Sequence, residues 1–283
     1  MFNAVNKLTL CALVAATLAA CGSSGSKDTE SAAKLVADAE NAIENHKYAE
    51  AIELLDTLQV RYPKEVEIQR KAMNVRPLAI EGLTISEMEQ TDSLLAVASW
   101  QVDSLAPLFK TIADEKLVEP YRVIKSATGD LFSTTGIESR LTQAGEFYMI
   151  SSLNGNPVKH TSVSLSSQAE RATTDNIPYD DAINYRSGNS EMITFTSTRC
   201  DTLGRFAIAH DNVKLTLTFH GKRDYSMTLS PKAVHSIADT YRMADAISRK
   251  NTLMKRQELL RAKLQLARDQ RARTLPDDTG TAD

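Results

Sequence analysis

Glycine and proline are distributed so unevenly along this chain of 283 residues that they divide it into three regions. Residues 31–119 contain one glycine, residues 120–230 contain seven, and residues 231–275 contain none. Pro120 and Pro231 stand at the two boundaries, and proline suits the first turn of a helix while disfavouring helix in the residue before it. We therefore expect helices, then a β-rich domain, then one long helix.

The first region opens with two amphipathic helices, and the second of them follows the turn in NHKYAEAIELLDTLQVRYP. This hairpin resembles one tetratricopeptide repeat. The matching positions are Leu35, Ala39, Ala42, Tyr48, Ala51, Leu55, Leu58 and Pro63. A shift of 34 residues puts Glu89 and Asp92 at apolar positions, so the repeat stops after one copy, whereas a solenoid needs about three. The resemblance implies at most a small protein-binding surface, and an ordinary helical hairpin is the alternative.

We expect residues 65–119 to continue as helix, and we expect Pro77 and Pro107 to kink or interrupt that helix. A broad apolar stripe follows this stretch and comprises Leu94, Leu95, Val97, Val102, Leu105, Leu108, Phe109 and Ile112. Trp100, the single tryptophan, is expected to pack in the core or the seam, with a ligand site as the alternative.

Residues 120–230 predict short strands, because β-branched and aromatic residues alternate with polar ones between glycine, asparagine and aspartate turns. The candidate strands are IESRLT, EFYMISSL, VKHTSVSL, EMITFT and VKLTLTF. No helical crossover separates them, so the sheets should be antiparallel. The expected fold class is α+β, with an antiparallel β-sandwich or jelly-roll domain inserted before the long C-terminal helix.

The C-terminal helix is expected over residues 231–275, with Ser230 as its N-cap and Pro231 as its first residue. Its later part, residues 249–273, holds nine basic and two acidic residues. Residues 81–119 hold eight acidic and two basic residues, so the two segments can pair within the chain.

An antiparallel pairing of these two helices places positions whose numbers sum to about 350 opposite each other. Glu87 then faces Lys263, and Glu89 faces Arg261. Apolar burial along the seam should supply most of the stability, since exposed ion pairs contribute only about 0–1 kcal/mol. Binding of the basic segment to an anionic membrane surface is the alternative.

The N-terminus has the order of an export signal, with Lys7 as its only charge and an apolar run from Leu8 to Ala20. Leu18-Ala19-Ala20-Cys21 resembles the lipobox of bacterial lipoproteins. The resemblance implies that residues 1–20 are a signal peptide and that Cys21 becomes the first mature residue and carries lipid. Ordinary cleavage with a free Cys21 is the alternative.

Residues 21–30 are small and polar, and we expect a flexible tether there. By resemblance to lipoprotein sorting in two-membraned bacteria, Gly22 in place of aspartate favours the outer membrane, with the periplasmic and surface faces both open. Residues 276–283 should be a disordered tail.

Only one loop suggests a ligand: it contains Asp175, Tyr179, Asp180, Asp181 and Tyr185. Its oxygens could hold calcium and its aromatic rings could stack on a sugar, and a solvated loop is the third alternative. The chain lacks the CxxC, HExxH, GxSxG and phosphate-loop patterns, so we assign no catalytic residue, metal or cofactor. The lipoprotein resemblance implies that Cys11 leaves with the signal peptide and that Cys21 is acylated, which leaves Cys200 without an intrachain cysteine to pair with. Cys200 is expected to be a buried, inert thiol, with a catalytic thiol as the alternative.

A formal charge of −3 does not suggest a nucleic-acid partner. We expect a non-enzymatic, lipid-anchored binding or scaffolding lipoprotein of the cell envelope, with an envelope protein as its partner. The alternative is a surface lipoprotein whose β-domain binds glycan through the loop around Tyr179.

Overall fold

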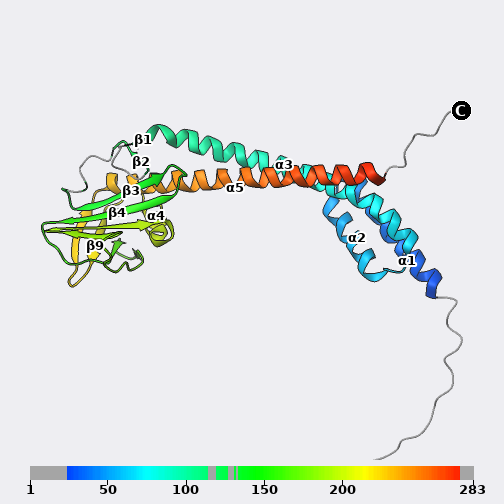
Figure 1. Cartoon of the computed structure of the whole chain (residues 1–283), viewed down its shortest axis with the longest axis horizontal. Coiled ribbons are helices and arrows are strands. Elements are labelled where there is room, and N and C mark those ends of the chain that lie inside the picture. Colours follow the sequence, from blue (N-terminus) through cyan, green and yellow to red (C-terminus); the bar gives the residue numbers. More distant parts are fainter. Residues whose placement is uncertain (1–23, 114–118, 127–130, 132, 275–283) are drawn as a thin grey trace, which may run out of the picture. The chain divides into compact units, whose positions relative to one another are not determined.

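The computed structural model describes residues 24–113, 119–126, 131 and 133–274. It divides into two compact units (Figure 1). Within the described residues, the first unit comprises 24–89 with 259–274, and the second lies within 90–258. The expected signal peptide over 1–20, Cys21 and the expected tail over 276–283 lie outside the described residues.

A helical hairpin, the start of a third helix and the end of the C-terminal helix build the first unit. The helices are α1 (Ser24–Glu44), α2 (Tyr48–Arg61) and α3 (Val66–Leu105). Their core is rich in alanine, which lets the helices approach closely, and includes Ala32, Val36, Ala39, Ala51, Leu55, Leu58, Ala72 and Ala79. Because α1 begins at Ser24, the expected tether over 21–30 is wrong from residue 24 onward. The buried stripe nucleates the helix, and extending an existing helix by polar residues costs little.

Helix packing requires the glycine at position 82 of α3. A Cβ on Gly82 would lie 2.2 Å from Cε1 of Tyr48, so the tyrosine ring of α2 rests directly on the backbone of α3. Tyr48 also places its hydroxyl 2.8 Å from Nδ1 of His46. Gly82 is therefore a packing glycine between two helices.

Pro77 and Pro107 have different consequences for α3. The helix continues through Pro77, so of the expected kink or interruption only the interruption is wrong. Val75 and Ala79 are buried on either side, and their packing offsets the lost hydrogen bond. By contrast, α3 ends at Leu105, and Pro107 lies in a 3-10 turn that leads into strand β1 (Phe109–Ile112). The expected helix therefore ends well before residue 119.

Two antiparallel sheets form most of the second unit and confirm the predicted α+β class. The first sheet has the strand order β1-β2-β3-β4-β8-β7, and the second has the order β10-β9-β5-β6. The remaining strands are β2 (Tyr121–Ile124), β3 (Gly136–Thr142), β4 (Phe147–Asn154), β5 (Ser162–Ser166), β6 (Arg171–Thr173), β7 (Asn184–Ser187), β8 (Ser190–Thr196), β9 (Leu215–His220) and β10 (Tyr225–Leu229).

One hydrophobic core joins both sheets to two helices. Inward residues such as Phe195 and Phe219 meet α4 (Asp201–Ala209) and the first half of α5 (Pro231–Thr274), seen in Figure 1 as the ribbon that turns orange beside the sheets. The sequence predicted only strands between residues 120 and 230, and this is wrong at residues 201–209, which form α4. Its buried face includes Gly204, where a Cβ would lie 2.1 Å from the ring of Tyr241. The domain is therefore a helix-packed pair of sheets, and β1 to β4 run as a simple meander rather than a jelly roll.

The long helix α5 begins as the sequence predicts, since the Ala233 N–H donates to Ser230 Oγ at 3.2 Å. In the first unit, Lys263 Nζ lies 3.5 Å from a Glu87 carboxylate oxygen, as the antiparallel register predicts. Arg268 and Arg271 both pair with Glu81 there. In the second unit, Gln257 donates to Asp92. None of the described helices is both long and apolar enough to cross a membrane.

Candidate functional site

The structure brings together part of the loop that the sequence singled out. The Tyr179 hydroxyl donates to Asp181, which raises the pKa of that tyrosine, and the Arg186 guanidinium lies 4.5 Å from the centre of the Tyr179 ring. Tyr179 and Tyr185 are each about half exposed. Arg186 covers one face of the Tyr179 ring, and both tyrosine rings keep a similar exposed fraction.

Asp180 serves the fold of this loop. Its Oδ1 accepts hydrogen bonds from the backbone N–H groups of Ala182, Ile183 and Asn184, at 3.0, 3.0 and 2.9 Å. These bonds, led by that of Asn184, hold the pKa of the carboxyl below its usual range. Asp175 belongs to a different neighbourhood, where its charge helps to raise the pKa of Cys200. Among the described residues, no group of three or more His, Cys, Asp or Glu side chains could hold a metal ion.

A buried polar chain that the sequence analysis missed lies between the sheets. Ser151 Oγ is 2.9 Å from His160 Nε2, and His160 Nδ1 is 2.9 Å from Glu191 Oε2. Glu191 also accepts the backbone N–H groups of Val158, Lys159 and His160. The only sequence signal was Glu191 in phase with the inward residues Ile193 and Phe195.

The three side chains are arranged in the order of a catalytic triad, namely nucleophile, base and acid, but their burial indicates a structural role. Ser151 and His160 are fully buried, and Glu191 is 2 % exposed, so a substrate does not reach the serine oxygen. Burial lowers the pKa of His160, which keeps the ring neutral, with Nδ1–H donating to Glu191 and Nε2 accepting from Ser151. Burial opposes ionisation of Glu191, but the hydrogen bonds from His160 and the backbone outweigh it and lower its pKa. The chain therefore fastens the segment before β5 to β4 and β8.

The Cys200 thiol is also part of the core. It is fully buried and donates to the Phe195 carbonyl oxygen at 3.2 Å. Burial raises the pKa of this thiol to about 12. Since the thiolate is the reactive form of cysteine, this geometry favours the inert thiol over a catalytic one.

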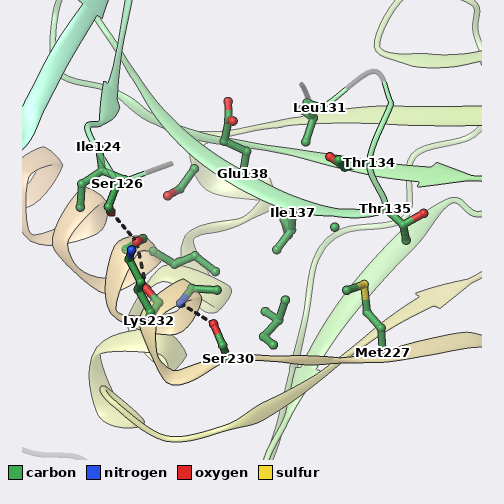
Figure 2. Close-up of a pocket in the computed structure, with 16 residues that line it drawn as sticks. Ile124, Ser126, Leu131, Thr134, Thr135, Ile137, Glu138, Met227, Ser230 and Lys232 are labelled. Carbon is green, nitrogen blue, oxygen red and sulfur yellow. Dashed lines mark hydrogen bonds between the residues drawn. The ribbon is translucent and has the colours of Figure 1, made fainter. Parts of the chain in front are cut away.

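A cavity of about 390 Å³ lies between the end of β2, β3, β10 and the start of α5 (Figure 2). Several of its polar side chains already make hydrogen bonds within the protein: the Oγ atoms of Ser126 and Ser236 lie 3.3 Å apart, and Ser230 caps α5. Glu138 at its wall pairs with Arg140. The remaining lining includes the apolar residues Ile124, Ile137 and Leu229. The cavity wall therefore combines polar and apolar side chains, without several reactive or charged groups that point at one spot.

The most unusual surface of the second unit is an apolar stripe on α3. Leu94 and Val97 are each 55 % exposed, and Trp100 is 69 % exposed. The expected packing of Trp100 in the core or seam is therefore wrong. Ala98 and Leu105 occupy the inner side of the helix. At 100° per residue, Trp100 lies about 160° and Val97 about 100° around the helix from Ala98, whereas Leu94 lies about 40° away, at the edge of the inner side. We call Leu94, Val97 and Trp100 the α3 stripe.

Two open cavities accompany the α3 stripe, and both are lined by α3 and α5 residues of the second unit, joined in the second cavity by Ile208 of α4. One, of about 370 Å³, is lined by Leu94, Val97, Ala98, Gln101, Ser248, Arg249, Thr252 and Leu253. The next, of about 360 Å³, is lined by Trp100, Gln101, Ser104, Leu105, Ile208, Arg242, Asp245, Ala246 and Arg249. We call these two cavities together the α3–α5 groove. A protein surface that combines an exposed tryptophan with adjoining hollows is suited to binding another macromolecule.

No protein-family model, curated protein or solved structure matches this chain. The proposals below therefore rest on the geometry of its own residues.

Proposed function

We propose that this chain is a non-enzymatic, lipid-anchored protein of the cell envelope that binds another protein through the second unit. The observation that carries the binding function is the α3 stripe. Large apolar side chains grouped on one surface commonly mark interaction sites, and tryptophan is enriched among the residues that dominate binding energy. The stretch 93–102 contains no charged residue, which further suits it to burial against a partner.

The anchor is proposed at Cys21, in the outer membrane. The helix α1 begins at Ser24, three residues after that cysteine, and three residues span at most about 10 Å even when fully extended. A lipid on Cys21 would thus hold the first unit close to the bilayer surface. Several acyl chains on one cysteine supply durable attachment, since each buried CH₂ contributes about 0.8 kcal/mol.

The binding function is tested with a photoreactive residue placed at Val97 or Trp100 of the full-length protein in intact cells. We expect the same discrete crosslinked protein from both positions, and its loss when Leu94→Asp is added to the Trp100 variant. A photoreactive residue at Thr228, which is exposed on β10 of the same unit, is the matched control. Absence of a crosslink from both stripe positions would show that the stripe does not bind a protein.

The anchor is tested separately by mass spectrometry of the membrane-extracted protein. The N-terminal peptide should begin at Cys21 and carry added acyl mass, and Cys21→Ala should release the protein from membranes or block its maturation. An unmodified Cys21 in a soluble product would contradict the anchoring proposal and leave the stripe unaffected.

A second candidate function is glycan binding by the loop around Tyr179. It is favoured by Tyr185, whose half-exposed side chain lies close enough to Tyr179 to affect its pKa, and by Asp181 and Arg186, which contact Tyr179 and are groups able to hydrogen-bond sugar hydroxyls. Tyr185→Ala should then abolish binding on a glycan array, while Tyr225→Phe on β10 should not. If the unaltered protein binds no glycan on the array, this candidate is wrong.

A further inference from the structure

The α3–α5 groove has the dimensions of a seat for a short helix. Its α3 wall runs from Leu94 to Leu105, so it extends about 17 Å at 1.5 Å per residue. That length matches about three turns of a bound helix. The two cavities share Gln101 and Arg249, so they follow one another along the same path. A helix with apolar side chains one turn apart could place one in each cavity.

The two walls of the groove differ in charge. Along the α3 wall from Leu94 to Leu105 the one charged residue is Asp103, whereas residues 242–256 of α5 hold five basic residues and one acidic residue, Asp245. Arg249 lines both cavities and is held by Asp245 at 2.8 Å. Arg256 follows seven residues later, on the same side of α5, and is exposed. One rim of the apolar groove is therefore positively charged.

We propose that the α3–α5 groove binds an amphipathic helix of a partner protein that carries acidic side chains along one flank. The apolar side chains of the partner helix enter the two cavities and cover Leu94, Val97 and Trp100. Its acidic flank faces Arg249 and Arg256. This inference rests on the proposed binding function and adds the chemistry of the partner.

Charge complementarity favours this occupant over a second copy of the chain. A two-fold pair would bring the same patch of both copies together. The basic rims, each with four positive residues over 246–257, would then approach one another. Like charges at an interface oppose association, whereas an acidic helix neutralises the rim.

The test uses Trp100 as a built-in probe, because it is the only tryptophan of the chain. The full mature lipidated protein is held in nanodiscs of neutral lipid and titrated with two tryptophan-free helical peptides of about 18 residues, longer than the marginal length for an isolated helix. Both peptides carry leucine at the same helical spacing, and they differ only in glutamate or lysine flanks. The glutamate peptide should shift Trp100 emission to the blue and bind roughly tenfold more tightly at low salt, with the ratio falling as salt rises.

Variants then locate the binding. Leu94→Asp should abolish the emission shift, and the double variant Arg249→Glu with Arg256→Glu should reverse the preference between the two peptides. Arg273→Glu, an exposed change on the same helix in the first unit, should leave both affinities unchanged. Circular dichroism of each variant should match that of the parent protein.

Other outcomes overturn the inference. Equal binding of the two peptides, or binding of neither, contradicts an acidic partner helix. A Trp100 shift that depends on protein concentration without peptide identifies a second copy as the occupant, and a shift caused by anionic vesicles identifies a lipid surface. If the peptides fail but the crosslinks from Val97 and Trp100 persist in cells, the binding function stands and only the acidic helix is wrong.

Discussion

Cys200 and the chain Ser151–His160–Glu191 show how single residues of the second unit are governed by burial. Each has a reactive side chain, yet each is placed where water and substrates do not reach it. Burial raises the pKa of the thiol to about 12 and lowers the pKa of the imidazole. These shifts disfavour the charged forms, so the groups contribute packing and hydrogen bonds.

The state of Cys200 leads to a prediction about thiol labelling. In the lipidated mature protein, a thiol reagent at pH 8 should modify no cysteine while the fold is intact and one cysteine after denaturation, because only unfolding exposes and ionises Cys200. Mass spectrometry of the labelled protein measures both numbers, and Cys200→Ser should give no labelling in either state. Stoichiometric labelling of Cys200 in the folded protein would instead indicate an accessible, reactive thiol.

Two contacts in the first unit show how single residues join its helices. The ring of Tyr48 rests on Gly82, and the carboxylate of Glu81 receives both Arg268 and Arg271. The hydrogen bond from Arg268 is the main cause that lowers the pKa of Glu81. The first contact brings α2 to α3, and the second brings the end of α5 to the same helix.

Gly82→Ala should destabilise the first unit although alanine has the higher helix propensity. Alanine gains about 1 kcal/mol in helix propensity, but its Cβ would lie 2.2 Å from the Tyr48 ring, and overpacking costs about 1–3 kcal/mol. We expect a net loss of about 1 kcal/mol in the free energy of unfolding by denaturant. In a Tyr48→Ala background the same change should become stabilising, and a double-mutant cycle that gives no coupling would contradict the contact.

Glu81→Gln should lower the free energy of unfolding by about 1 kcal/mol at pH 7, at the upper end for exposed ion pairs, because one carboxylate serves two arginines. The folded pKa of Glu81 lies below its unfolded value, so this contribution is present above about pH 4.5 and is lost as the pH falls through the folded pKa. Glu67→Gln, which removes an exposed pair with Arg70 inside α3, is the matched control and should cost less than about 0.5 kcal/mol. Equal losses from the two variants would show that pairing with α5 adds nothing.

At the scale of the whole molecule, several groups with lowered pKa values act in the same direction on acidification. They comprise His160, Glu191, Asp180 and Asp211 in the second unit and Glu81 in the first. The unfolded chain binds more protons than the folded chain at each of these groups. Each therefore contributes stability that decreases as the pH falls.

The contribution of His160 is the first of these to be lost. Its folded pKa lies below the unfolded value of 6.5, so the unfolded state gains a proton below that pH while the buried ring stays neutral. The free energy of unfolding should then fall by up to about 1.4 kcal/mol per pH unit between pH 6.5 and the folded pKa. His160→Gln should remove this slope, measured by denaturant unfolding from pH 7.5 to 5. A parent slope no steeper than that of the variant would show that His160 does not stay neutral.

The element types of this chain follow from local spacing. Alternation of polar and apolar residues predicted antiparallel strands, and Ser230-Pro231 predicted the start of α5, because these patterns depend on neighbours within a few residues. The pairing of Glu87 with Lys263 also followed from counting residues along two antiparallel helices. The loop of Tyr179, Asp180 and Asp181 could be proposed from residue types alone, but not the use of Asp180 by the backbone.

The sequence by itself determined the α+β class, the long helices and the antiparallel strands. This is because the spacing of apolar residues shows which residues share one face of a helix or strand. Only the tertiary structure decided which face is buried, because burial depends on surfaces supplied by distant segments. The α3 stripe shows this plainly: Trp100 had the pattern of a core residue, yet Ala98 and Leu105 take the inner side of the helix. Packing against distant segments likewise keeps α3 helical through Pro77 and stabilises α4 between the strands. It also places Ser151, His160 and Glu191, which come from different segments, within hydrogen-bonding distance of one another.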